Sequence, residues 1–164
     1  MLSAKLCRSL GLTFQKLKKT DQAKCYFTQY LKEVSDLDRQ LSNRQTGLLL
    51  ADSCDCVGGL CADTGDYAGA KTSYEYGLKL RIQIHQHNPS DPAACYNLAA
   101  SYENLAFVSF AKKDFDTAIR YYNESLDNQF LYWENTHTLQ AGLDLADCYR
   151  TLAQLYLQTG NHKE

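Results

Sequence analysis

Small and apolar residues recur along the chain in a fixed pattern of four positions. The positions are spaced three, one and three residues apart, and the third is always Gly or Ala. Residues with this spacing lie on one stripe of a helix with 3.6 residues per turn. The pattern therefore predicts four similar amphipathic helices. Its occurrences are Cys7-Leu10-Gly11-Phe14, Cys54-Val57-Gly58-Cys61, Tyr102-Leu105-Ala106-Ser109 and Tyr149-Leu152-Ala153-Tyr156.

A second pattern follows the first three of these segments and consists of an Ala with an aromatic residue four positions later. The Ala positions 23, 70 and 118 follow the segment starts at 7, 54 and 102 with the same offset each time. This constant offset indicates an internal repeat of two helices, in which the Gly or Ala position of the first helix is small because the second helix crosses closely there. One pair cannot bury its apolar faces alone, so neighbouring pairs must stack. The pairs of residues are Ala23 and Phe27, Ala70 and Tyr74, and Ala118 and Tyr122.

Together the two patterns resemble the tetratricopeptide repeat family, whose repeat reads W-x-x-L-G-x-x-Y and then A-x-x-x-F. The turns between the helices fit at Gly65-Asp66-Tyr67, Lys113-Asp114-Phe115 and Gly160-Asn161-His162, whereas the first repeat has Lys18-Lys19-Thr20. The resemblance implies an all-α fold. We expect a right-handed α-α superhelix of about three and a half antiparallel helix pairs.

The repeat of about 47 residues is longer than the family value of about 34, so the helices must be long. It is similar to the long repeats of kinesin light chains and of bacterial regulators with related arrays. Residues 68–87 and 92–112 contain no helix breaker, and Ser90-Asp91-Pro92 is typical of a helix start. Ser42-Asn43-Arg44-Gln45 matches a capping box and predicts another start.

The repeat boundaries predict one domain over residues 1–164, with units at about 1–43, 44–90, 91–135 and 136–164. The fourth unit has a first helix, expected over residues 144–159, but no second one. We therefore expect the chain to be an excerpt of a longer array or multidomain protein.

Composition and charge narrow the class of protein. The chain has 164 residues, of which 45% are hydrophobic, and a formal net charge of -2. This charge does not favour nucleic acid or an anionic membrane as partner, since both attract a clustered basic surface. No stretch approaches eighteen apolar residues. Seven cysteines, an odd number, indicate free thiols in a reducing compartment, so we expect a cytoplasmic protein.

No catalytic, cofactor-binding or metal-binding motif stands out. Cys54, Cys56 and Cys61 form the densest cysteine cluster, but Cys54 and Cys61 occupy packing positions of the repeat, where a thiol acts as a small apolar residue. We therefore predict no metal site, no cofactor and no enzyme activity. The tyrosines also invite a ligand-stacking interpretation, yet four of them lie at packing positions and are predicted to be structural. These are Tyr74, Tyr122, Tyr149 and Tyr156.

The resemblance also implies a binding surface, because in this family the first helix of each unit lines a concave groove. The middle of that surface is acidic with two exposed aromatic residues beside it, and its N-terminal edge is basic. This suits a peptide with basic residues near an apolar anchor. Leu12, Cys56 and Ala100 stand where a carboxylate clamp for chaperone tails would need Asn, Asn and Lys, so we do not expect that ligand. The groove residues are Lys5, Arg8, Gln15, Lys16, Asp52, Asp55, Asp63, Glu103, Asn104, Phe107, Phe110, Asp147, Arg150 and Gln154.

These observations predict a scaffold that binds a protein or peptide segment in its concave groove. Two alternatives stay open. The chain could be a structural segment that self-associates by stacking of solenoid ends, or the regulatory part of a longer enzyme or transcription regulator. Fold alone does not choose between them.

Overall fold

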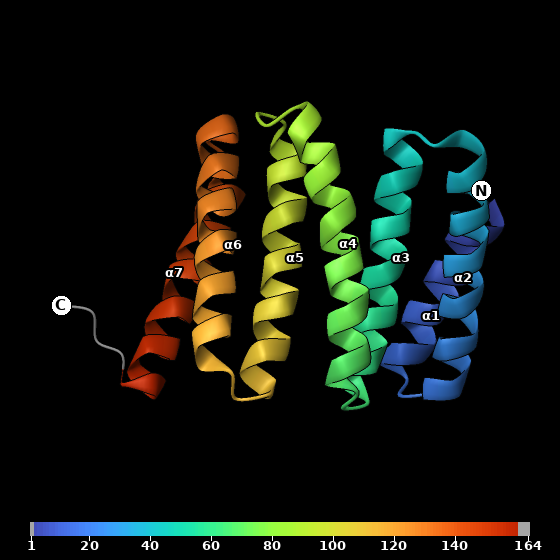
Figure 1. Cartoon of the computed structure of the whole chain (residues 1–164), viewed down its shortest axis with the longest axis horizontal. Coiled ribbons are helices and arrows are strands. Elements are labelled where there is room, and N and C mark those ends of the chain that lie inside the picture. Colours follow the sequence, from blue (N-terminus) through green and yellow to red (C-terminus); the bar gives the residue numbers. More distant parts are fainter. Residues whose placement is uncertain (1, 161–164) are drawn as a thin grey trace. The chain divides into compact units, whose positions relative to one another are not determined.

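The computed structural model describes residues 2–160, which form seven α-helices joined by short turns (Figure 1). This part of the chain contains no β-strand, and six of its helices are 20 to 22 residues long. The prediction of an all-α fold with long, paired helices is confirmed. The helices are α1 (Leu2–Lys16), α2 (Thr20–Leu41), α3 (Arg44–Asp63), α4 (Tyr67–His87), α5 (Pro92–Ala111), α6 (Phe115–Thr136) and α7 (Leu139–Thr159).

The chain divides into two compact units, residues 1–84 and residues 85–164. The first unit holds α1, α2, α3 and most of α4, and the second holds α5, α6 and α7. Each unit is described by itself. A single domain over residues 1–164 and the handedness of the superhelix stay predictions.

Two helix starts show how local side chains set the element boundaries. Asp91 caps α5 by accepting a hydrogen bond from the amide of Ala93 at 3.1 Å, with Pro92 at the first helical position, as predicted. The capping box of α3 begins one residue later than predicted. Asn43 Oδ1 accepts from the Thr46 amide at 3.0 Å, and Thr46 Oγ1 accepts from the Asn43 amide at 3.2 Å.

The predicted start of the last helix was also wrong. Helix α7 begins at Leu139 rather than at residue 144, because the Thr138 side chain accepts from the Ala141 amide at 3.2 Å and so caps an earlier turn. Ser42, the residue that we expected to cap α3, instead ends α2 in the left-handed conformation with φ 41°.

A residue in the left-handed conformation follows the first helix of each repeat within the described residues. A residue with positive φ lies at Lys18, Gly65, Lys113 and Gly160, and these positions follow one another with the period of the repeat. The first repeat therefore makes this turn as well, although its sequence Lys18-Lys19-Thr20 departs from the family pattern. Asn161 and His162 of the last predicted turn lie outside the described residues.

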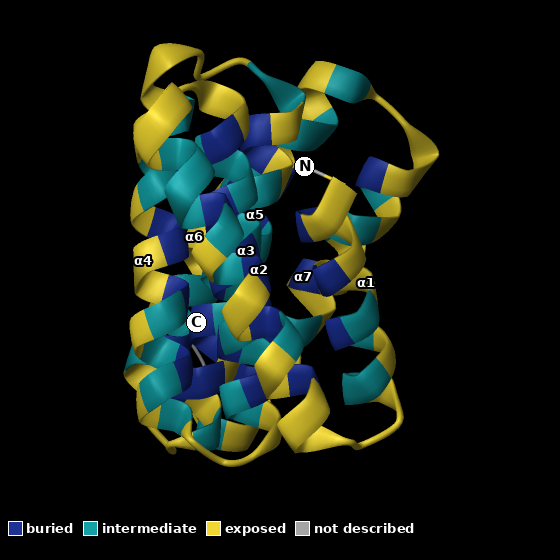
Figure 2. Ribbon diagram, turned by 90° about the vertical axis from the view of Figure 1, so that its right-hand side faces the viewer, coloured by how far each residue is buried: buried dark blue, intermediate teal, exposed yellow. Residues whose placement is uncertain are grey.

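In α1 and α3 the small residue of the pattern lies against the aromatic ring of the following helix, as predicted. A Cβ atom added to Gly58 would stand 2.7 Å from the Tyr74 ring, and one added to Gly11 would overlap the Phe27 ring. Across the same contacts the repeated Ala positions of α2, α4 and α6 are fully buried. Figure 2 shows buried positions along the helices and exposed turns.

Helix α7 packs against α6, but the described residues include no second helix of its own repeat. Ala153 is exposed, whereas Ala106, its equivalent in α5, is fully buried. Tyr149 is 54% exposed, so the prediction that it is a packing residue was wrong.

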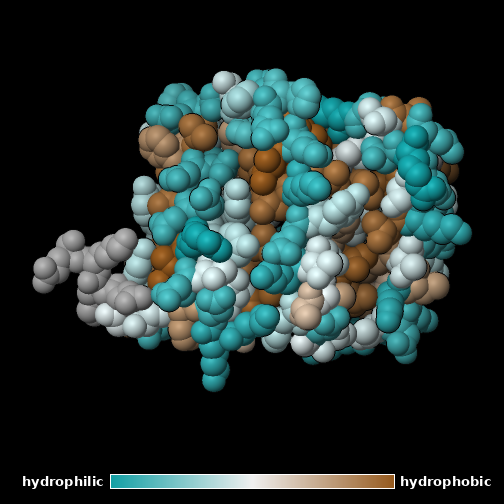
Figure 3. Space-filling model, in the orientation of Figure 1, coloured by the Kyte–Doolittle hydropathy of each residue, from teal (hydrophilic) through white to brown (hydrophobic). Residues whose placement is uncertain are grey.

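On the face of the molecule in Figure 3, hydrophilic side chains cover most of the surface and hydrophobic ones lie in the furrows between them.

The close crossing of α3 and α4 can be tested with two neighbouring glycines. We expect Gly58→Ala to lower the free energy of unfolding by about 1–2 kcal/mol, because the clash with Tyr74 outweighs the gain in helix propensity. A Cβ at Gly59 meets its nearest atom at 3.6 Å, so Gly59→Ala should leave stability unchanged or raise it by up to about 1 kcal/mol. Urea unfolding followed by circular dichroism measures both. Equal effects of the two substitutions would contradict the close crossing.

Candidate functional site

Two cavities lie along the first helices, one in each unit. The first-unit cavity of about 690 Å³ lies along α1 and α3, and Tyr30 of α2 also lines it. The second-unit cavity of about 480 Å³ lies along α5 and α7, and Tyr122 and Gln129 of α6 also line it. The first is lined by Lys5, Arg8, Ser9, Leu12, Thr13, Lys16, Tyr30, Gln45, Leu48, Leu49 and Asp52. The second is lined by Tyr96, Ala100, Glu103, Asn104, Phe107, Tyr122, Gln129, Asp144, Asp147, Cys148 and Thr151.

Most of the predicted groove residues fall in these cavities. The first-unit cavity contains four of them, the second-unit cavity four, and a smaller second-unit cavity of about 230 Å³ contains Phe110 and Gln154. Gln15, Asp55, Asp63 and Arg150 line none of the three. The members of the first group are Lys5, Arg8, Lys16 and Asp52, and those of the second are Glu103, Asn104, Phe107 and Asp147.

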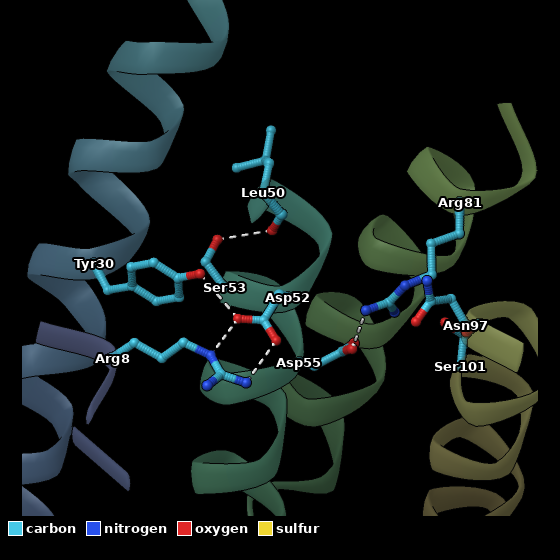
Figure 4. Close-up of polar contacts among 9 residues, drawn as sticks. All are labelled: Arg8, Tyr30, Leu50, Asp52, Ser53, Asp55, Arg81, Asn97 and Ser101. Atoms are coloured by element: carbon cyan, nitrogen blue, oxygen red, sulfur yellow. Dashed lines mark hydrogen bonds and ion pairs between the residues drawn. The ribbon is translucent and has the colours of Figure 1, made fainter. Parts of the chain in front are cut away.

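In the first unit, Arg8 and Asp52 bind each other. The Arg8 Nε and Nη2 atoms donate to the two Asp52 carboxylate oxygens at 2.6 and 3.0 Å, and the Tyr30 hydroxyl donates to Asp52 Oδ2 at 2.9 Å (Figure 4). The hydrogen bond to Asp52 raises the pKa of Arg8, and burial raises the pKa of Tyr30. This network joins α1, α2 and α3, and it neutralises the Asp52 carboxylate internally.

Asp55 also has an internal cation. Arg81 Nη2 donates to Asp55 Oδ2 at 2.5 Å, and the Arg81 side chain is only 8% exposed (Figure 4). Burial raises the pKa of Asp55, against the opposing effect of Arg81. Asp63 accepts a hydrogen bond from Gln15 Nε2 at 2.6 Å. The three acidic groove residues of α3 are thus engaged within the first unit.

The carboxylates of the second-unit cavity have a different setting. Glu103, Asp144 and Asp147 line it, and none of its lining residues is Lys, Arg or His. Arg150 pairs with Asp147 at 2.9 Å, but both side chains are more than 60% exposed, so solvent screens this pair. Phe107 is 51% exposed within the same cavity. The acidic and aromatic character that we expected of the groove is therefore concentrated here.

Sequence reasoning missed seven of the residues that line this cavity, among them Tyr96, Gln129 and Asp144. Gln140 Nε2 donates to Asp144 at 2.7 Å within the exposed part of α7. A signal for Gln129 was present, because it follows Ala118 at the same offset at which Arg81 follows Ala70. Extending the repeat alignment beyond the aromatic position would have placed the two residues at equivalent positions.

The cysteine cluster of α3 has the environment of a packed interior. Cys54 and Cys56 are buried and Cys61 is partly exposed. Burial raises the pKa of Cys54 to about 11 and that of Cys56 to about 12. Within residues 2–160, no three His, Cys, Asp or Glu side chains are grouped so that they could hold a metal ion. None of the helices in this part of the chain combines the length and apolar character needed to cross a membrane.

Residues 99–129 match the family model of the tetratricopeptide repeat. The match identifies one tetratricopeptide repeat in this segment, and members of that family generally bind protein partners. A comparison with curated proteins gave no match. The similarity to the long repeats of kinesin light chains stays a prediction.

The matched segment shows where the extra residues of the long repeat lie. It runs from α5 through the turn into α6, and it leaves out residues 92–98 of α5 and 130–136 of α6. Both omitted segments lie at the ends of the helices away from the turn at Lys113. Seven residues add about two turns, or about 10 Å, to each helix. The second-unit cavity draws on both parts, since Tyr96 belongs to the extension and Phe107 to the matched repeat.

Chemical modification of the thiols tests whether the cysteines are buried as the structure shows. At pH 8 we expect iodoacetamide to modify exposed Cys25 first, while Cys54, Cys56 and Cys148 stay unmodified in the native protein. Burial raises the pKa of these three thiols to about 11, 12 and 11, so very little thiolate is present to react. Peptide mapping by mass spectrometry gives the order of modification. All seven should react in denaturant, and modification of Cys54 as fast as Cys25 in native protein would refute the expected burial.

Proposed function

We propose that this chain is a protein-interaction scaffold that binds segments of a partner protein in the cavities along its first helices. The observation that carries the proposal is the second-unit cavity. There a half-exposed Phe107, inside the segment that matches the tetratricopeptide repeat, lies in one cavity with three carboxylates. Large exposed aromatic side chains in concave sites are the usual anchors of protein interfaces.

The charges of the second-unit cavity favour a particular kind of segment. Glu103, Asp144 and Asp147 attract basic residues, and Phe107 provides an apolar surface beside them. A segment with basic residues next to an apolar one fits both features. Two internal contacts, Arg8 with Asp52 and Arg81 with Asp55, make the first unit a weaker candidate for the same ligand.

The first-unit cavity favours the opposite charge. Lys5 and Lys16 lie at its two ends along α1, and Leu12 and Leu48 form part of its apolar lining. The stretch of helix between the two lysines spans about 16 Å. This cavity suits an acidic segment with an apolar residue between its charges, which is a second binding mode of the same scaffold.

A peptide array tests the proposal, using sequences that combine basic and apolar residues, followed by fluorescence anisotropy with the best binder. We expect Phe107→Ala to weaken binding at least about ten-fold, because the anchor surface is lost. Phe130→Ala is the matched control, since Phe130 is 40% exposed on α6 and lines none of the three cavities.

Helicity measured by circular dichroism should be the same in both variants and in the unchanged chain. An array without any selected sequence would overturn the proposed function. Equal affinity of the Phe107→Ala variant and the unchanged chain would overturn the site.

A second candidate function is self-association, and the exposed stripe of α7 favours it. Apolar residues recur along this helix at spacings of four, three, seven and four, which keeps them on one face. The equivalents of two of them in α5, Ala99 and Ala106, are fully buried. The stripe consists of Leu139, Leu143, Ala146, Ala153 and Leu157.

Light scattering over a range of concentrations tests whether a second copy covers this stripe. We expect the mass to rise above the 18.6 kDa of one chain as concentration increases. Leu143→Glu with Leu157→Glu should keep the mass at one chain, because charged side chains would have to be buried in the contact. Leu41→Glu, at an exposed position of α2, is the control and should behave as the unchanged chain. A constant monomer mass would rule this candidate out.

A further inference from the structure

One position is buried in each of the three described second helices, α2, α4 and α6, but has a different chemistry in each. It follows the repeated Ala at a constant offset and is occupied by Val34, Arg81 and Gln129. These residues are 0%, 7% and 4% exposed. Because the burial is the same, the difference between the repeats is one of polarity and charge.

In the second repeat this position supplies a cation to a carboxylate of the first helix. Arg81 donates to Asp55. Asp55 directly follows Cys54, the first residue of the four-position pattern in α3. The equivalent carboxylate of the third repeat is Glu103, which directly follows Tyr102. Here the position of Arg81 is taken by the neutral Gln129. The third repeat thus keeps the carboxylate and lacks the built-in guanidinium.

In the third repeat, both the carboxylate and the residue at the position of Arg81 have an oxygen that can accept a further hydrogen bond. Ser125 Oγ donates to Glu103 Oε1 at 3.0 Å, which leaves the other carboxylate oxygen for further donors. Gln129 Oε1 is buried and accepts no hydrogen bond from the described residues. Buried polar atoms without a partner are uncommon in folded proteins. Since Gln129 lines the second-unit cavity, the missing donor can come from a ligand in that cavity.

The walls of the cavity suit a planar cation. Asp144 and Asp147 add negative charge opposite Glu103, and Tyr96 and Phe107 are 45% and 51% exposed beside them. A guanidinium has five N–H donors in a fixed plane and also stacks on aromatic faces. An ammonium group has neither the fork of donors nor the flat surface.

We propose that the second-unit cavity binds an arginine side chain of a partner protein. Its guanidinium donates to Glu103 and to Gln129 Oε1, and it takes the role that Arg81 has beside Asp55 in the second repeat. This inference rests on the proposed function, because it specifies one residue of the partner segment. In a repeat with an internal arginine the carboxylate is already paired, and in a repeat without one the carboxylate can bind a cationic ligand.

The experiment uses the full chain labelled with ¹⁵N and the probe N-acetyl-arginine methylamide. We expect saturable shifts of the Gln129 side-chain amide signal and of the Phe107 backbone signal. The citrulline analogue, which has the same shape without the charge, and the lysine analogue should bind at least about ten-fold more weakly.

Two substitutions give opposite information about the site. Gln129→Arg supplies an internal guanidinium and should abolish the probe-dependent shifts while the melting temperature stays the same or rises. Glu103→Gln removes the carboxylate and should weaken probe binding at least about ten-fold. Asn123→Arg adds the same charge at an exposed position of α6 and should bind the probe like the unchanged chain.

Several results would overturn the inference. They are citrulline or lysine probes that bind as tightly as arginine, undiminished binding to the Gln129→Arg variant, or shifts that do not saturate. If Gln129→Arg fails to fold, Glu103→Gln decides, and unchanged affinity in that variant overturns the inference.

The failure of this inference can be told apart from failure of the proposed function. An array ligand that depends on Phe107 but not on arginine or Glu103 leaves the scaffold function in place and removes the arginine site. An array without any ligand removes the scaffold function, whatever the small probe does.

Discussion

The close crossing of the two helices in each pair is the constraint on which the rest of the structure depends. A Gly or Ala on the first helix allows the ring of the second helix to approach, as with Gly58 and Tyr74. Because interiors are packed at the density of crystals, this contact fixes the rotation of both helices about their axes. The rotation in turn decides which side chains of the first helices face the cavities. The cavities are therefore a consequence of the same repeated packing residues that hold the helix pairs together.

The packing residues could be predicted from the sequence because the same contact is repeated. Three occurrences of Ala and an aromatic residue at constant offset define the core, and the structure buries Ala23, Ala70 and Ala118 completely. Helix boundaries that depend on a single capping side chain were predicted less accurately. Thr138 starts α7 earlier than the hydrophobic pattern indicates, since a hydroxyl cap leaves no periodic signal. Tyr149 follows the pattern but is exposed, because burial also requires a covering helix that periodicity does not reveal.

The groove residues show a different limit. Their positions on the first helices followed from the repeat, and most of them line cavities. The ion pairs that they form did not follow, because Asp52 and Asp55 find their cations on other helices, Arg8 and Arg81. The partners in these pairs are far apart along the chain, and a single sequence gives no signal for such contacts. Only the three-dimensional contacts show that Asp52 and Asp55 have internal cations, whereas no basic residue lines the second-unit cavity.

The extensions of the long repeat have a consequence for how this architecture can change. Residues 92–98 and 130–136 lie beyond the segment that matches the family, at the ends of α5 and α6 away from the turn. They bring their own aromatic contact, in which the rings of Tyr96 and Tyr132 lie 5.3 Å apart, so they are held together without the helix signature. A substitution of Tyr96 alters the lining of the cavity and leaves the small residue at the helix crossing, Ala106, in place. The repeat thus separates into a part that sets the geometry and a part in which ligand preference is free to diverge.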